Sequence, residues 1–487
     1  MKFKSPDRNQ VNPVKWGQRL LFFVGLLVLA PYAKAQPLNS KESRPNIIYI
    51  LADDLGYGNL TCYNPSSRVS TPNLDKMAQE GTRFNRFYAG STVCAPSRCA
   101  LMTGLHTGHN YIRGNGEVDL REKDSTLAQY MKQAGYTTGM FGKWGLGKEN
   151  TAGAPQLKGW DEFVGYLDHR HAHNYYTDHL WQVRRGNLSR LPLDTTVYTH
   201  DVILNNALSF IEANQKRPFF LYLPVTLVHA ELTAPPSDLK PFLTADGKSR
   251  LAPETPYFQK PAPNLYKSQP LPHAAFAAML NRLDSDVGRL LALLKKLNLD
   301  QNTLVIFTSD NGPHNEAGAD PEFFDSNGPL RGIKRDLYEG GIRVPMIARW
   351  PGRIPANRVD NSVWANWDML PTFCRLINVT SPAGIDGLSM LPLLLGKQPA
   401  SKHPYLYWQL GEGIFKQAIL KEDWKLIRLK APGKPEVLEL YNLKTDEAEK
   451  NNLATQNPAK LAELQRDLKS AVTPAEHPFF DYSSFER

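Results

Sequence analysis

The stretch RPNIIYILADD, residues 44–54, decides the fold class of this 487-residue chain. It is an uninterrupted apolar run, rich in β-branched and aromatic side chains, that ends in two acids. Such a run is typical of a strand buried on both faces of a parallel sheet. Comparable runs follow at GYTTGMFG (135–142), RPFFLYLPVTLVHA (217–230), NTLVIFTSDNG (302–312) and RVPMIARWPG (343–352). We expect all of them to be strands of one large sheet.

Helical patterns alternate with these runs. One of them, STLAQYMKQAG (125–135), has Ser125 as its expected N-cap and Gly135 as its stop. The others are TPNLDKMAQEG (71–81), DVILNNALSFIEAN (201–214) and AAFAAMLNRLDSDVGRLLALLKKLN (274–298). Strands that alternate with helices form βαβ units. The sequence therefore predicts an α/β fold, with a large, mostly parallel sheet flanked by helices.

The pattern changes near His403. YLYWQL, FKQAILKEDWKLIRL and EVLELYNL favour antiparallel strands, and PAKLAELQRDLKSAV favours a helix. We therefore expect a large N-terminal domain at residues 36–400 and a small α+β subdomain with an antiparallel sheet at residues 401–487. Residues 233–272 are rich in proline, and a long loop beside such a sheet is often part of a substrate site.

Residues 1–35 have the features of a secretory signal. Basic side chains precede an apolar stretch at residues 20–30, and Ala33-Lys34-Ala35 suits a signal peptidase. This stretch is too short for a bilayer, which needs about 20 residues. We expect cleavage after Ala35, export to the periplasm or the medium, and no stable membrane span afterwards. An uncleaved anchor is the alternative.

Net charge restricts the class of binding partner, and the cysteine count bears on disulfide bonds. The formal net charge is +9, and the leader carries six Lys/Arg and one Asp, which leaves +4 for the rest of the chain. This modest, dispersed charge suits a small anionic substrate and argues against nucleic acid. The four cysteines, Cys62, Cys94, Cys99 and Cys374, allow three full pairings in an oxidising compartment. Chemistry at Cys94 would leave an odd number, so the pairing stays open.

Polar side chains follow several predicted strands. Asp53 and Asp54 close the first, and Asp310 and Asn311 close TLVIFTS. Ligands collect at the carboxyl ends of parallel strands, and such oxygen donors suit Ca²⁺ or Mg²⁺. The alternative is that each pair only starts a turn. Taken one at a time, Lys143, His229 and Lys334 would be read as ordinary solvated or packed side chains. Their similar placement after strands indicates that they belong to a functional site.

The segment CAPSRCALMTG, residues 94–104, resembles the signature of the type I sulfatases. In that family the cysteine of C-x-P-S-R is converted to formylglycine by a maturation enzyme. Further segments resemble the family in the same order: PNIIYILADDLGYGNL, STPNLDKMAQEGTRF, FGKWGLG, FTSDNG, GIKRDLYEGGIRVP and DWKLIRL…ELYNLKTDEAEKNNL. The resemblance implies an alkaline-phosphatase-like fold with a smaller C-terminal subdomain.

The resemblance also implies roles for individual residues. Ca²⁺, or Mg²⁺ as the alternative, would be bound by Asp53, Asp54, Asp310, Asn311 and the modified Cys94. The basic residues of the sulfate site would be Arg98, Lys143, His229 and Lys334. The expected partners are therefore a sulfated saccharide and a maturation enzyme.

The chemistry of such a site follows from the aldehyde. Its hydrate has two hydroxyls on one carbon: one attacks sulfur, and deprotonation of the other expels sulfate. The metal would polarise the sulfate, and Asp310 beside it could take the proton of the nucleophile. His229 with Lys334 would protonate the leaving alcohol. Arg98 and Lys143 would hold the sulfate.

One position departs from the family pattern. Many members have Lys-Trp-His where this chain has Lys143-Trp144-Gly145, and that histidine is associated with the release step. Lys143, water, or a histidine of DHRHAHNYYTDH would have to substitute. That segment contains His169, His171, His173 and His179, of which we expect His171 or His173 to reach the substrate. A polar loop, or a metal site of its own, is the alternative for this cluster.

The substrate expected from the resemblance is an O-sulfated carbohydrate of the galactose type. Trp160, Tyr175, Tyr176 and Trp181 suit stacking on sugars but equally suit a core. Two other functions stay open. One is phosphonate or phosphate ester hydrolysis on the same fold, and the other is binding of a sulfated glycan without catalysis.

Overall fold

Strand β1, Asn46–Ala52, lies in the interior of an 11-stranded sheet and is buried along its whole length. The computed structural model describes residues 44–260, 266–399 and 401–486. Side chains alternate between the two faces of β1, as they do in any strand. Ile47, Tyr49 and Leu51 join one hydrophobic cluster, whereas Ile48, Ile50 and Ala52 join another. The continuous apolar run in the sequence reflects this double burial.

The remaining strands of this sheet are β2 (Thr82–Tyr88), β3 (Thr137–Lys143), β4 (Glu162–Tyr166), β5 (His179–Arg184), β6 (Asn187–Pro192), β7 (Phe219–Pro224), β8 (Thr303–Ser309), β9 (Arg343–Arg349), β10 (Arg358–Asp360) and β11 (Trp364–Ala365). Their order is β10-β2-β9-β8-β1-β7-β3-β4-β5-β6, and β11 pairs with β2. The central strands β8, β1, β7, β3 and β4 are parallel to one another. Their carboxyl ends therefore meet at one edge of the sheet.

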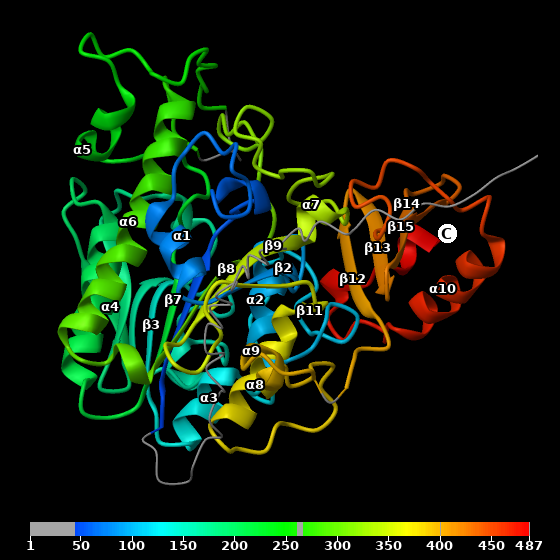
Figure 1. The fold of residues 1–487 in the computed structure, drawn as a ribbon, viewed down its shortest axis with the longest axis horizontal. Helices are drawn as coiled ribbons and strands as arrows, with labels where there is room; N and C mark the ends of the chain where they lie inside the picture. Colours follow the sequence, from blue (N-terminus) through cyan, green and yellow to red (C-terminus); the bar gives the residue numbers. More distant parts are fainter. Residues whose placement is uncertain (1–43, 261–265, 400, 487) are drawn as a thin grey trace, which may run out of the picture. The chain divides into compact units, whose positions relative to one another are not determined.

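Helices cover both faces of this sheet (Figure 1). On the face of Ile48 lie α1 (Pro72–Gln79), α4 (Thr199–Asn214) and α6 (Pro272–Lys296). On the face of Ile47 lie α2 (Cys94–Thr103), α3 (Leu127–Gln133) and α8 (Met369–Leu376). Three helices of a single turn are α5 (Pro236–Leu239), α7 (Glu339–Ile342) and α9 (Leu391–Leu394).

The predicted α/β architecture is confirmed, with two differences in detail. Thr126, not Ser125, is the N-cap of α3, and its backbone N–H donates to the side chain of Gln129 at 2.8 Å. Strand β9 runs antiparallel to both β8 and β2. The connection from β8 to β9 contains only the single turn α7, and a parallel pairing would need a longer crossover helix.

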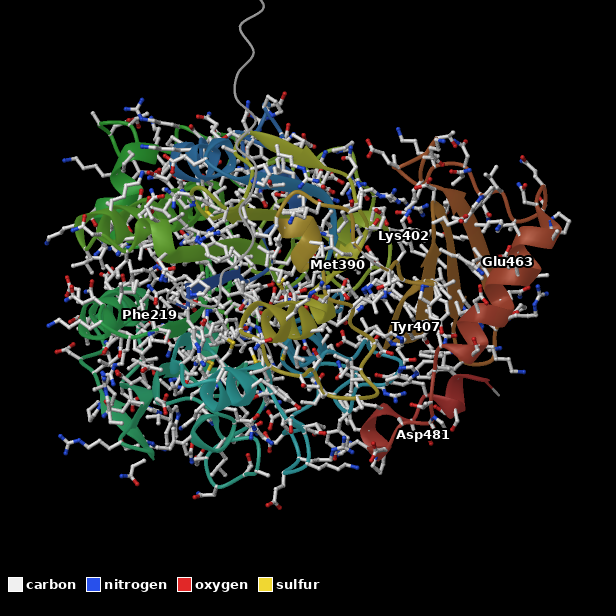
Figure 2. The ribbon with its side chains drawn as sticks, turned by 60° about the horizontal axis from the view of Figure 1, so that its bottom comes forward. Phe219, Met390, Lys402, Tyr407, Glu463 and Asp481 are labelled. Carbon is white, nitrogen blue, oxygen red and sulfur yellow. The ribbon has the colours of Figure 1, made fainter. Side chains whose placement is uncertain are left out.

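A second sheet lies in the C-terminal part of the chain. It consists of the antiparallel strands β12 (Leu406–Glu412), β13 (Ile414–Lys421), β14 (Trp424–Lys430) and β15 (Val437–Asn442). Helix α10, Pro458–Ser470, packs on one face through Leu464 and Leu468 (Figure 1). Figure 2 labels Tyr407 on β12 and Glu463 on α10. The antiparallel sheet with its helix was expected, and the boundary between residues 400 and 401 stays a prediction.

Three further points bear on the sequence predictions. No helix in the described ranges is long and apolar enough to span a membrane. The expected signal, residues 1–35, lies outside the described residues. All four cysteines are free thiols, and Cys94, Cys99 and Cys374 are buried.

A buried charge cluster connects the two sheets. The ammonium of Lys425 on β14 lies 2.8 Å from Glu339 at the start of α7 and 2.9 Å from Glu449 after β15. All three side chains are fully buried. Burial raises the pKa of Glu449 to about 7, and the Glu339 carboxylate adds to the rise while Lys425 opposes it. Two carboxylates thus share one ammonium in a dry environment.

This cluster predicts a pH dependence of stability. The pKa of Glu449 is raised in the folded chain, so between its ordinary value and about 7 the folded state holds a proton that the unfolded state has lost. The stability contributed by that proton is lost as pH rises through this window. Glu449→Gln removes the titration. We therefore expect the melting temperature of this variant, relative to wild type, to rise between about pH 5 and about pH 8.

Thermal unfolding at a series of pH values checks this. Glu447→Gln is the matched control, because its side chain is half exposed. A Glu449→Gln curve parallel to wild type across the whole pH range would contradict the prediction.

Candidate active site

The candidate site lies where the parallel strands end. Two acids follow β1, Lys143 ends β3, His229 follows β7, and an acid and an amide follow β8. Backbone hydrogen bonds continue past the strands, from Asp310 N–H to the Ala52 carbonyl at 3.1 Å. All the strand-end residues predicted from the sequence are buried and come together here: Asp53, Asp54, Lys143, His229, Asp310 and Asn311.

Cys94 is the first residue of α2. Pro96 is compatible with this helix because it stands in the first turn, where no intrahelical bond to its nitrogen is needed. The Cys94 thiol donates to Asp53 Oδ1 at 3.3 Å and lies 3.9 Å from Asp54 Oδ1. Burial raises the pKa of this thiol well above its ordinary value, and Asp53 adds to the rise. Cys94 is therefore a neutral donor here, and its sulfur is a poor nucleophile.

Two cations flank Asp53. The Lys143 ammonium lies 2.7 Å from Asp53 Oδ2, and the Arg98 guanidinium lies 3.4 Å from the same oxygen. Burial raises the pKa of Asp53, but Lys143 and Arg98 outweigh burial and hold the pKa well below its ordinary value. Arg98 also donates to Asp310 Oδ2 at 2.8 Å and to the Lys143 carbonyl at 2.7 Å. Arg98 and Lys143 therefore both lie beside the carboxylate that contacts Cys94.

Lys334 and His229 form a pair on the other side of Asp54. The Lys334 ammonium lies 2.8 Å from Asp54 Oδ2 and donates to His229 Nε2 at 3.0 Å. His229 Nδ1 is paired with the Ala230 carbonyl, so Nε2 is the acceptor nitrogen of a neutral ring. Burial lowers the pKa of His229 well below its ordinary value, and Lys334 lowers it further. Lys334 therefore carries the proton of this pair.

Glu316 belongs to the site but was not predicted from the sequence. Its carboxylate lies 3.5 Å from the Lys334 ammonium and accepts from the Tyr266 hydroxyl at 2.8 Å. Burial raises the pKa of Glu316, but Lys334, Arg335 and other neighbouring groups together outweigh burial and hold the pKa well below its ordinary value. A signal existed, because Glu316 stands only a few residues after the β8 strand end in DNGPHNE.

His229 stacks between two other imidazole rings. His173 stacks on it with a centroid distance of 4.7 Å, and His314 stacks on it at 5.4 Å. The hydroxyl of Tyr175 donates to the His229 carbonyl at 2.8 Å. Tyr175 and Trp160, two of the aromatic residues that would suit sugar stacking, are both core residues.

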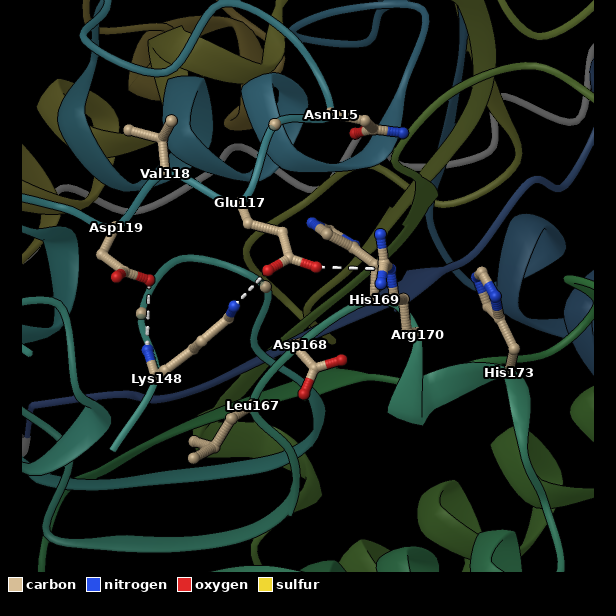
Figure 3. Close-up of a pocket in the computed structure, with 13 residues that line it drawn as sticks. Asn115, Glu117, Val118, Asp119, Lys148, Leu167, Asp168, His169, Arg170 and His173 are labelled. Atoms are coloured by element: carbon tan, nitrogen blue, oxygen red, sulfur yellow. Dashed lines mark hydrogen bonds and ion pairs between the residues drawn. The ribbon is translucent and has the colours of Figure 1, made fainter. Parts of the chain in front are cut away.

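A cavity of about 210 Å³ opens beside the site (Figure 3). Asn115 lines it and accepts from the N–H of Ala95 at 3.0 Å, so its wall reaches the residue after Cys94. His173 also lines it, whereas the His171 ring bonds to Thr177 at 3.1 Å and is not among the lining residues. The other lining residues are Gly116, Glu117, Val118, Asp119, Gly145, Gly147, Lys148, Leu167, Asp168, His169 and Arg170.

The donor set fits a hard divalent cation. Ligand atoms of Asp53, Asp54 and Cys94 lie within 4.8 Å of one another, together with His229. Asn311 Oδ1 is buried and has no hydrogen-bond partner in the described part of the chain, although its amide nitrogen donates to Asp54. Burial and the Asp53 charge raise the pKa of Asp310 to about 7, because the carboxylates at these strand ends repel one another. Oxygen donors of this kind suit Ca²⁺ or Mg²⁺.

Comparison with protein families gives two matches. The family described as Sulfatase matches residues 45–379, and N-sulphoglucosamine sulphohydrolase, C-terminal, matches residues 333–477. N-acetylgalactosamine-6-sulfatase of Canis lupus familiaris is 32% identical over 417 residues, covering 80% of this chain and 72% of the relative. N-acetylgalactosamine-6-O-sulfatase of Bacteroides thetaiotaomicron is 30% identical over 522 residues, covering 90% and 96%.

Comparison with solved structures also finds proteins with the same fold. Ps i-CgsB in complex with k-i-k-neocarrahexaose superposes with a TM-score of 0.72 at 28% identity, covering 88% of this chain and 92% of that one. Phosphonate monoester hydrolase of Agrobacterium radiobacter, at 19% identity and a TM-score of 0.64, shares the fold, with 88% and 95% covered. The matched family spans the strand ends and the Cys94 helix described above. This chain therefore belongs to the sulfatase family of sulfuric ester hydrolases.

Proposed function

We propose that this protein hydrolyses O-sulfate esters of carbohydrates, with a formylglycine made from Cys94 and a bound divalent cation. The observation that carries the proposal is the Cys94 side chain at the start of α2, directly against the Asp53 and Asp54 carboxylates. Two findings support a galactose-type sugar as the substrate. Two relatives are named for N-acetylgalactosamine, and one similar solved structure is a complex with a neocarrahexaose.

The residues around Cys94 have different roles in the proposed reaction. When Cys94 is converted, formylglycine supplies as its hydrate an oxygen nucleophile in place of the thiol. Arg98 and Lys143 offer the positive charge that a sulfate ester needs, since both lie next to Asp53 beside Cys94. Lys334, with His229 as its acceptor, holds a proton for the leaving alcohol.

Conversion of Cys94 requires a maturation enzyme as a partner, and we propose that the protein acts outside the cytoplasm. The basic and apolar pattern of residues 1–35 supports export. Detection of the chain in the periplasm or medium with Gln36 as its first residue would agree with this. An intact leader on the mature protein would contradict it.

A bound cation predicts a thermal shift. We expect EDTA to lower the melting temperature and added Ca²⁺ or Mg²⁺ to restore it. A ligand at 100 times its dissociation constant stabilises a folded chain by about 2.7 kcal/mol. Differential scanning fluorimetry measures the effect. Asn311→Ala should reduce the shift, because it removes the unpaired buried oxygen, whereas the exposed Asp246→Asn should leave it unchanged. Equal melting temperatures with and without cations would argue against this site.

The proposed function is tested in two steps on protein produced with a maturation enzyme. Mass spectrometry of the tryptic peptide 87–98 determines whether Cys94 carries an aldehyde. Ion chromatography then measures sulfate released from N-acetylgalactosamine 6-sulfate and from neocarrahexaose. Release from either sugar supports the proposal. An unmodified thiol would rule out the formylglycine, and cleavage of phosphonate or phosphate monoesters alone would favour the alternative hydrolase.

A further inference from the structure

We propose that His169, after the end of β4, is the base that accepts the proton when sulfate leaves the enzyme. This inference rests on the proposed function and selects, from the four histidines of residues 168–179, one that the sequence did not favour and that the comparisons do not identify. It starts from the packing of His169 against Gly145, which stands two residues after Lys143.

Sheet pairing beyond the strand ends places the two residues together. Strands β3 and β4 are parallel, and their hydrogen bonding continues past both strands. Trp144 N–H donates to the Tyr166 carbonyl at 2.9 Å, and Gly145 N–H donates to the Leu167 carbonyl at 3.0 Å. The chain after Leu167 therefore runs beside Gly145, and His169 follows within two residues.

The His169 ring fills the place of a side chain at position 145. A Cβ built on Gly145 would lie 2.7 Å from His169 Cε1 and 3.2 Å from its Nε2, too close for both to be present. Gly145 also has φ +72°, a conformation that favours glycine. The imidazole thus lies next to the segment that carries Lys143, whose ammonium pairs with Asp53 beside Cys94.

Both ring nitrogens of His169 are buried and lack a hydrogen-bond partner in the part of the chain that the structure describes. Buried polar groups are nearly always paired, so two unpaired nitrogens on one ring indicate a missing partner. His169 lines the same cavity as Asn115, which bonds to the residue after Cys94. Figure 3 shows the cavity with both residues. A polar group on a substrate or a modified Cys94 would complete this ring.

The neighbouring histidines have other contacts. His171 bonds to Thr177, and His179 Nδ1 lies 2.6 Å from Asp178. His173 stacks on His229 and therefore belongs to the side of Lys334, where the leaving alcohol is protonated. Of this cluster, His169 is the ring with both nitrogens buried and unpaired.

His169 is in the protonation state that a base requires. Burial lowers its pKa well below the ordinary value, and the Lys143 and Arg98 charges lower it further. The ring is therefore neutral at neutral pH and can accept a proton. A bound sulfate would offset part of the charge of these two cations and so make the ring more basic.

The proton transfer balances as follows. After transfer of the sulfuryl group, one oxygen of the hydrated aldehyde carries sulfate and the other is a free hydroxyl. The hydroxyl gives its proton to a ring nitrogen of His169, and the O–H electron pair becomes the second bond of the C=O group. The C–O bond to sulfate breaks, and sulfate leaves with the electron pair of that C–O bond. The protonated His169 ring then releases its proton to water. The aldehyde is restored, and water hydrates it again.

The test is a trapping experiment with His169→Ala and His169→Gln. We expect turnover to fall by about 10²- to 10⁴-fold, which is typical for loss of a general base. The first equivalent of desulfated product should still form in a burst. After an acid quench, the tryptic peptide 87–98 should carry one added sulfate group in most molecules, while the wild-type peptide should not.

The outcomes separate this inference from the proposed function. A wild-type peptide with an unmodified thiol means that the proposed function has failed. A second outcome is a wild-type enzyme that carries the aldehyde and turns over, while neither variant shows a burst or a sulfated peptide. This outcome overturns the role of His169 and leaves the proposed function intact. His169→Gln keeps the size of the ring in case His169→Ala does not fold, and peptide mass verifies the aldehyde in both. His179→Ala is the matched control and should release sulfate like wild type, since its ring lies outside the cavity lining.

Discussion

Cys94→Ala is expected to abolish sulfate ester hydrolysis, with a fall in kcat of about 10⁴- to 10⁶-fold, as is typical when an enzyme loses its nucleophile. Alanine cannot be converted to an aldehyde, so no oxygen nucleophile forms beside Asp53 and Asp54. The fold should survive, because the thiol is a small buried group whose hydrogen bonds are to these two carboxylates. Initial rates on a sulfated sugar and thermal unfolding measure the two effects.

Cys99→Ala is the matched control for this variant. Cys99 is buried in the same helix, and its thiol donates to Asn110 Oδ1 at 3.2 Å. We expect this variant to keep its activity and to lose about 1 kcal/mol of stability, the scale of one hydrogen bond. Activity in Cys94→Ala that matches Cys99→Ala would mean that position 94 is not the nucleophile.

Lys334→Ala is also expected to have a large effect on the rate, and the effect should depend on the leaving group. Lys334 holds the proton beside His229 and Asp54, and an alcohol leaves a sugar sulfate only with a proton. Loss of a general acid costs about 10²- to 10⁴-fold in rate. p-Nitrophenolate leaves without a proton, so hydrolysis of p-nitrophenyl sulfate should fall much less. The ratio of kcat/KM for the two substrates, in variant and wild type, measures this difference.

Lys416→Ala controls for damage to the loop that carries Lys334. The Lys416 ammonium donates to the Arg335 carbonyl at 2.8 Å, so its loss perturbs the same loop without removing the proton donor. We expect both substrates to be affected equally and only slightly in this control. Equal and large losses for both substrates in Lys334→Ala would show that Lys334 positions the sulfate and does not protonate the leaving group.

The predictions from the sequence were most successful for the parallel strands and their ends. The runs that form β1, β7 and β8 are apolar without interruption because both faces of each strand are covered. In parallel strands the residues after each run must meet at one edge. This rule predicts that Asp53 and Asp310 lie close together, and in the folded chain their side chains share Arg98.

The predictions failed where pairing depends on what lies between the strands. RVPMIARWPG has the same apolar pattern as its neighbours, yet β9 is antiparallel, and nothing in its composition distinguishes the two directions. Ser125 and Thr126 are both acceptable N-caps, and the Thr126 hydroxyl is placed by its bond to the Lys158 carbonyl at 2.6 Å. Contacts from distant segments decided both cases.

The sequence by itself determined the α/β class, the strand-end acids and bases and the special position of Cys94, because each depends on local periodicity or on one short motif. Only the tertiary structure decided which loop residues complete the site. Glu316, Asn115 and His169 reach it through side chains on irregular segments whose paths are set by long-range packing. A side chain at position 145 is missing in this sequence, and the ring that occupies its place belongs to the segment after the neighbouring strand β4. The register of β4 against β3 is fixed only when the sheet forms.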